Sequence, residues 1–340
     1  MLAVVADSAR EFWKLFRKGD AFVEGTGVWG YLEEASHDPS PMVFEAMANV
    51  PSDIEVTDLL ERELRNLSVP VDIGVTPKSP RFRTSLKTPH LISAPPPKGS
   101  FVRLSSEAYV SSHEYSFVQT GTSYDLVELI WAGNCLCSSF AINTSATGGF
   151  VESKPVTTRS RLEGFIRKSS RIRGIAHAKR AVRFVRDGAA SPMETAVTML
   201  LCLPCSLGGF GLNAPRINKK IRPGTKGNVK LGQSEYIFDL VWPESKFVLE
   251  YDGEACHTGI DRISHDSVRR SDLVYLGYSV FVMTKQQAYS QETFEQCAIK
   301  IAHGIGTRLQ HRRSPDWPQK NAMLRQKLLY DRLRPGCTWA

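Results

Sequence analysis

The sequence predicts a mixed α/β fold, in which a mainly helical N-terminal region and a small β-containing middle unit precede a C-terminal αβββαβ core. Three observations predict this class. Apolar residues at helical spacing dominate residues 1 to 69, β-rich pieces interrupted by prolines follow to residue 122, and strand-like and helix-like segments alternate over residues 191 to 305. A length of 340 residues favours two domains.

The first 150 residues contain no motif that names a chemistry, and we leave their function unassigned. Ser8 and Ser52 are placed to cap two helices. The pieces SFVRLS (100–105) and YSFVQT (115–120) are typical of short strands, and residues 123 to 137 are expected to be helical. The N-terminal segment reaches acidic residues after only a few apolar ones, which is too short for a secretory signal.

From residue 191 onward the elements are better defined. Ser191, Pro192 and Glu194 mark a helix start, with a capping serine, a proline in the first turn and an acid at the third position. After a connector rich in Pro, Lys and Gly, the segments SEYIFDLVW (234–242) and KFVLEYD (246–252) alternate as two strands around a turn at residues 243–245. A helix over residues 264–276, a strand over 278–284 and a closing amphipathic helix complete this domain, which we place at residues 191 to 310.

Three carboxylates are expected to meet on the central hairpin. Side chains alternate along a strand, so Glu250 and Asp252 share one face, and pairing across the turn brings Asp239 opposite Glu250 or one residue away. Ionised carboxylates at that separation repel one another, and a hard divalent cation, Mg²⁺ or Mn²⁺, relieves the repulsion. The alternative is that these acids pair with Lys or Arg on a half-exposed sheet.

The ordered set Glu194, Asp239, Glu250-Tyr251-Asp252-Gly253, His257, Asp266 and Arg269 resembles the very-short-patch repair endonuclease-like domains of bacterial proteins, within the PD-(D/E)XK, restriction-endonuclease-like superfamily. The phrase LGYSVFV (276–282) is similar to their last helix-to-strand passage, and the resemblance covers about 115 of the 340 residues. It implies a fold that binds Mg²⁺ or Mn²⁺ through Asp239, Glu250, Asp252 and Glu194 and hydrolyses DNA phosphodiesters. Similar domains also occur in abortive-infection antitoxin-like proteins, where cleavage need not be the task.

One position departs from the superfamily pattern. A lysine should stand two residues after the motif glutamate, and Asp252 occupies that place. The very-short-patch relatives also lack this lysine and use histidine chemistry, so the resemblance implies that His257 is the acid/base, although a single histidine also fits a structural role. Glu194 has a local explanation as a capping acid, and Asp266 with Arg269 has one as an ion pair on a helix.

Positive charge is concentrated on both sides of this domain. Residues 151 to 190, expected to form a basic helical connector, hold eleven Lys or Arg against three acids, an excess equal to the net charge of +8 of the whole chain. Residues 308 to 334 hold eight more, and we expect a basic C-terminal helix over 311–340. Such runs fit either a solvated helix face or contacts with phosphates. Their position favours DNA, with these expected contacts: Arg167, Lys168, Arg171, Arg173, Arg269 and Arg270.

The main hypothesis is therefore a Mg²⁺-dependent DNA endonuclease. The alternative is a catalytically silent DNA-binding regulator or antitoxin-like protein that keeps the nuclease fold as a scaffold, and a third candidate is a protein-interaction module built on the N-terminal helices. Seven cysteines at irregular spacing and no apolar run of membrane-spanning length predict a cytoplasmic protein without a membrane partner. The sequence leaves a homodimer open.

Overall fold

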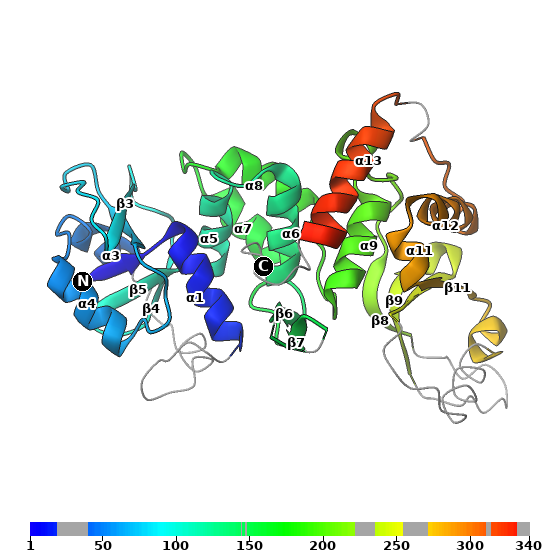
Figure 1. Cartoon of the computed structure of the whole chain (residues 1–340), viewed down its shortest axis with the longest axis horizontal. Coiled ribbons are helices and arrows are strands. Elements are labelled where there is room, and N and C mark those ends of the chain that lie inside the picture. Colours follow the sequence, from blue (N-terminus) through cyan, green and yellow to red (C-terminus); the bar gives the residue numbers. More distant parts are fainter. Residues whose placement is uncertain are drawn as a thin grey trace. The chain divides into compact units, whose positions relative to one another are not determined.

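The computed structural model describes residues 1–18, 40–143, 145–146, 148–221, 235–253, 271–310 and 314–331. The chain forms two compact units, residues 1–186 and 187–338. Helices and mixed sheets are combined in both, so the expected mixed α/β class is confirmed (Figure 1). None of the helices in these ranges combines the length and the apolar character that crossing a membrane requires.

A five-stranded sheet of order β3-β2-β1-β5-β4 is the centre of the first unit. Its strands are β1 (Leu2–Val4), β2 (Val71–Val75), β3 (Lys87–Leu91), β4 (Phe101–Arg103) and β5 (Ala108–Ser111). The helices that precede the later strands are α1 (Ala6–Lys18), α3 (Ser40–Ala46) and α4 (Asp53–Arg62). Apolar residues of α1 and α4, among them Phe12, Trp13, Val56 and Leu59, pack with the sheet into one buried core.

A group of helices follows this sheet in the first unit (green in Figure 1). It consists of α5 (His113–Thr120), α6 (Leu126–Leu136), α7 (Arg159–Lys168), α8 (Ile175–Ala181) and the 3-10 turn η1 (Val182–Phe184), with a small hairpin of β6 (Phe140–Ile142) and β7 (Phe150–Glu152) after α6. The residues that we expected to form a basic connector are therefore α7, α8 and the loops around them. Their apolar side, including Leu162 and Phe165, is buried within the unit.

Three expectations for the first unit were wrong. The segment YSFVQT is not a strand but most of helix α5, which Ser112 caps by accepting a hydrogen bond from the Tyr115 amide; almost every residue of α5 is buried, so it shows no helical stripe. Residues 2–4 form a central strand, too short to show a period. Ser8 lies inside α1, and its hydroxyl and amide both donate to the Asp72 carboxylate instead of capping the helix.

The second unit carries the expected order of elements. Helix α9 (Pro192–Cys202) is followed by η2 (Cys205–Leu207), β8 (Arg216–Ile221), β9 (Tyr236–Trp242), η3 (Pro243–Ser245), β10 (Phe247–Asp252), a helical segment at residues 271–275 and β11 (Ser279–Thr284). The sheet order is β11-β10-β9-β8, antiparallel except for the parallel pair β10–β11. Strand β8 lies in the segment that we expected to be a connector, because its alternation is masked by the charged residues of an edge strand.

Helices close this unit after the sheet: α11 (Lys285–Tyr289), α12 (Gln291–Gly304), α13 (Trp317–Arg325) and the π-helical turn η5 (Gln326–Asp331). In Figure 1, α13 runs beside α9. The expected basic C-terminal helix is thus a packed element, and its Arg325 is 4% exposed, donates to the Ala288 carbonyl at 2.8 Å and lies over the Phe294 ring. Arg325 is therefore not a contact for phosphates.

Candidate functional site

Polar side chains occupy one level across three neighbouring strands of the second sheet. Leu240 pairs with Leu249 between β9 and β10, so the next residues along, Asp239 and Glu250, lie level with each other. The register between β8 and β9 brings Asn218 to the same level. Residues opposite one another on neighbouring strands present their side chains to the same face. Asn218, Asp239 and Glu250 therefore form a polar row, as the hairpin pattern predicts for the two acids.

The Asp239 carboxylate is fixed by the backbone of the neighbouring strand. The paired residues of β9 and β10 end at Leu240 and Leu249, and beyond this point Asp239 Oδ2 accepts a hydrogen bond from the Tyr251 amide at 2.8 Å. A side chain thus takes the place of a backbone acceptor at the end of the ladder. This bond orients the carboxylate beside the strand that carries Glu250.

Helix α9 brings a third acid to this row. Ser191 caps the helix, as predicted, by accepting from the Glu194 amide, and its hydroxyl donates to Glu194 Oε1 at 2.8 Å. Glu194 Oε2 accepts from the Ala190 amide at 2.9 Å and from Asn218 Nδ2 at 2.6 Å. The Glu194 side chain is therefore 8% exposed and holds the start of α9 to strand β8.

The environment of Glu194 favours its protonated form. Burial, as the largest cause, raises the pKa of this carboxyl above its usual 4.5, and the neighbouring charge of Asp239 adds to the rise. The hydrogen bonds from Ala190, Ser191 and Asn218 act in the opposite direction. The interaction with Asp239 places the start of α9 on the sheet face that carries the polar row.

Asn218 was not foreseen from the sequence. Its backbone has a φ of +46°, in the left-handed region where asparagine is among the better tolerated residues, and Nδ2 also donates to the Gly188 carbonyl at 2.8 Å. The side chain thereby connects the loop before α9, the Glu194 carboxylate and strand β8. A lone asparagine in a Pro, Lys and Gly-rich segment gave no signal of this role.

Asp252 lies at the exposed end of β10. It pairs with Thr284, the last residue of β11, whose hydroxyl caps α11 by accepting from the Gln287 amide. Strand alternation puts Asp252 on the face of Glu250, two residues further from the buried part of the hairpin. His257, Asp266, Arg269 and Arg270 lie outside the described residues.

The oxygen donors of this row match the requirements of Mg²⁺. That ion is usually held by one or two protein carboxylates, with water and substrate phosphates completing its octahedron. Asp239 and Glu250 provide such a pair, whereas the Glu194 oxygens are already occupied by three donors. Within the ranges that the structure describes, no three His, Cys, Asp or Glu side chains form a ready metal cluster.

The expected DNA-contacting residues that can be located belong to the first unit. Arg167 and Lys168 are exposed in the last turn of α7. Arg171 and Arg173 lie in the loop between α7 and α8, also exposed. These four cations and the carboxylate row therefore belong to different units of the chain.

Comparison with known proteins adds no relative, since the chain matches no family model, no curated protein and no solved structure.

Proposed function

We propose that the second unit is a metal-dependent endonuclease domain of the PD-(D/E)XK kind, which hydrolyses phosphodiester bonds of DNA. The observation that carries this proposal is the level placement of Asp239 and Glu250 on adjacent strands, with buried Glu194 beside them. Acids gathered on one face of a sheet repel each other, and a divalent cation turns this repulsion into binding.

Mg²⁺ or Mn²⁺ would be held by Asp239 and Glu250, and once bound it would polarise the scissile phosphate and lower the pKa of a water. Asp239 is already oriented for this role by the Tyr251 amide. Glu194 and Asn218 have a positioning role, because their hydrogen bond fixes α9 against β8 next to the row. Asp252, at the exposed end of β10, is available to accept a hydrogen bond from water. His257 is the proposed acid/base.

A DNA-binding regulator is the second candidate, and one specific observation favours it. Asp252 stands where the superfamily pattern has lysine, so the described part of the site offers no cation at that position to orient and deprotonate the attacking water. In this alternative the domain holds DNA without cutting it. DNA is the partner in both proposals, and a cytoplasmic location accompanies both.

The deciding experiment is a cleavage assay with the full chain. Purified protein with Mg²⁺ or Mn²⁺ is offered duplex, mismatched and single-stranded DNA. We expect nicking or cutting that Glu250→Gln abolishes while DNA binding is retained, because the amide keeps the shape and loses the charge that holds the metal. Glu244→Gln, an exposed acid in the turn of the same hairpin, is the matched control and should cut like wild type.

Failure of the wild-type protein to cut any of these substrates, with DNA binding unaffected by Glu250→Gln, would reject the nuclease proposal in favour of the regulator. If cleavage occurs, His257→Ala tests the proton-transfer role, since general acid/base catalysis typically contributes about 10² to 10⁴ in rate. Cleavage by that variant at the wild-type rate would remove His257 from the mechanism.

A further inference from the structure

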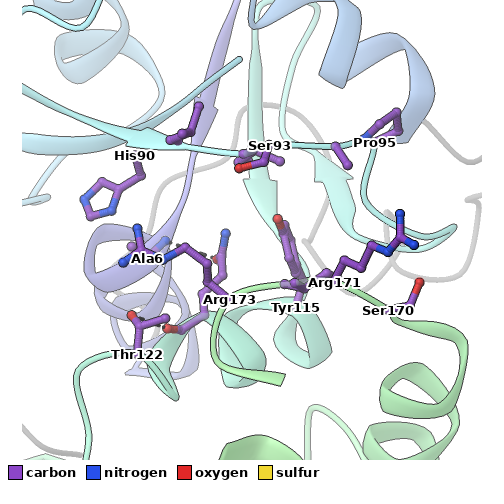
Figure 2. Close-up of a pocket in the computed structure, with 14 residues that line it drawn as sticks. Ala6, His90, Ser93, Pro95, Tyr115, Thr122, Ser170, Arg171 and Arg173 are labelled. Carbon is purple, nitrogen blue, oxygen red and sulfur yellow. Dashed lines mark hydrogen bonds between the residues drawn. The ribbon is translucent and has the colours of Figure 1, made fainter. Parts of the chain in front are cut away.

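The first unit contains a cavity of about 340 Å³ that the proposed nuclease site does not use. Its walls come from the start of α1, the segment that follows β3, helix α5 and the loop between α7 and α8. Figure 2 shows His90, Ser93 and Pro95 on one side, Arg171 and Arg173 on the opposite side, and the Tyr115 ring between them. The volume is near the lower end, about 300 Å³, of pockets that hold small ligands.

The charged residues of this cavity all have the same sign or are neutral. Of the 14 described residues that line it, Arg171 and Arg173 are cationic, His90 can become so, and none is a carboxylate. Cationic side chains of the preceding helix are neutralised within the unit: Arg159 pairs with Glu163 at 2.8 Å and Arg161 with Glu114 at 3.1 Å.

Arg171 and Arg173 differ from those helix residues, because neither forms an ion pair with a carboxylate in the described ranges of the chain. Arg171 also adopts a φ of +61°, a left-handed conformation that is uncommon for a residue with a long side chain. Such a conformation persists where the surroundings determine the loop, and it is found preferentially at ligand sites. The loop thus presents two uncompensated guanidinium groups to an enclosed space.

The neutral walls are held in place by hydrogen bonds of their own. His90 Nε2 contacts Asp72 Oδ1 at 2.7 Å, and Gln119 Oε1 accepts from the Ala6 amide at 3.2 Å. Burial raises the pKa of Tyr115 to about 12, so its phenol stays a neutral donor at physiological pH. Because the Ala6 and Ser8 amides at the start of α1 are already bonded, the positive potential comes from the two arginines and not from the helix terminus.

We infer that this cavity is a binding site for a phosphomonoester, with the Arg171 and Arg173 guanidinium groups as the phosphate ligands. The planar arginine fork matches phosphate oxygens and binds them through charge-assisted hydrogen bonds. A phosphomonoester is the group that a closed space of this size can receive, since a continuing phosphodiester chain needs an open track on both sides. A free mononucleotide and the 5′-phosphorylated end of a nucleic acid strand both carry this group.

The test is a titration of the full chain in a buffer with EDTA, so that no divalent ion takes part. The probes are 5′-AMP against adenosine, and a short single strand with a 5′-phosphate against the same strand with a 5′-hydroxyl. We expect a preference for the phosphorylated member of at least one pair. A preference for 5′-AMP alone identifies a free nucleotide, and one for the phosphorylated strand identifies a strand end.

Two variants connect that preference to the cavity. Arg171→Gly removes the cation and suits the left-handed backbone, so it should fold normally, and Arg173→Gln removes the other charge. Each should weaken the phosphate-dependent binding about ten- to hundred-fold, the usual effect of removing a charge-assisted hydrogen bond. Arg180→Gln, an exposed cation on α8 outside the cavity, is the matched control and should bind like wild type.

Equal binding of phosphorylated and unphosphorylated probes, or no binding of any probe, would overturn the inference. So would a phosphate preference that survives both arginine variants. Glu250→Gln should leave these titrations unchanged, and this result separates the cavity from the proposed nuclease site.

Discussion

The buried carboxyl of Glu194 gives the most detailed prediction about the second unit. Glu194→Ala removes the acceptor of the Asn218 amide and of the Ser191 hydroxyl, bonds of 2.6 and 2.8 Å. The Ala190 amide also loses its partner, but Ala190 is exposed and water can replace the carboxylate there. With net values of about 1 kcal/mol for an ordinary hydrogen bond and somewhat more for one to a charged group, we expect a loss of about 2–3 kcal/mol in the free energy of unfolding.

Glu194→Gln separates charge from shape. The amide oxygen can still accept from Ala190 and Asn218, and its NH₂ group can donate to Ser191, so the loss in the free energy of unfolding should stay below about 1 kcal/mol. The variant has no titrating group, which makes the pH dependence of the difference between wild type and variant specific to this carboxyl.

The sign of that dependence follows from the raised pKa of Glu194. The folded state binds the proton more tightly than the unfolded state, so the stability due to this group is fully present below the ordinary pKa of 4.5 and decreases as pH rises through the raised value. The free energy of unfolding of wild type relative to Glu194→Gln should therefore fall across this window and be constant above it. Mg²⁺ bound by the neighbouring carboxylates should lower the pKa and move the window to lower pH.

Hydrogen exchange in urea, measured by mass spectrometry on peptides from α9 and β9, reports the unfolding of this unit apart from the first. A difference between wild type and Glu194→Gln that is flat from pH 4 to pH 7 would refute the assigned burial and its effect. A loss in Glu194→Ala no larger than that in Glu194→Gln would show that the hydrogen bonds do not hold α9 to β8.

Two further predictions concern the basic helix α7 and the packing of the second sheet. Neutralising Arg167 and Lys168 to Gln should weaken DNA binding and reduce its dependence on log salt by up to about 0.9 for each phosphate that is no longer neutralised, whereas exposed Lys98→Gln should not; an unchanged salt slope would make the end of α7 a solvated face. Gly304→Ala would place a methyl group 2.3 Å from Phe247 Cε2, so we expect a loss of about 1–3 kcal/mol in urea unfolding despite the better helix propensity of alanine, and unchanged stability would contradict the packing of α12 on β10.

The hairpin of the second unit was predictable because its residues alternate strongly. One face of Tyr236–Trp242 and Phe247–Asp252 is buried, and the turn between them sets the register, so the opposition of Asp239 and Glu250 follows from sequence alone. The capping serine of α9 was predictable for a similar reason, since Ser191 and Glu194 interact within one turn.

What could not be predicted depends on contacts between segments distant in sequence. Asn218 acquires its role only when β8 pairs with β9, and the Asp72 carboxylate that binds Ser8 lies 64 residues away. Helix α5 is buried on all sides, so its apolar residues show no period that separates a helix from a strand. Arg325 counts as a surface charge in the sequence, yet packing turns it toward Phe294.

The most direct test of the proposed function is calorimetric titration of Mn²⁺ into the full chain and its Asp239→Asn variant. The asparagine oxygen can still accept from the Tyr251 amide, so the strand end is preserved while one metal-binding charge is removed. The account predicts that wild type and the Glu244→Gln control bind Mn²⁺ and that Asp239→Asn loses this binding without loss of stability. Undiminished Mn²⁺ affinity in Asp239→Asn would contradict it.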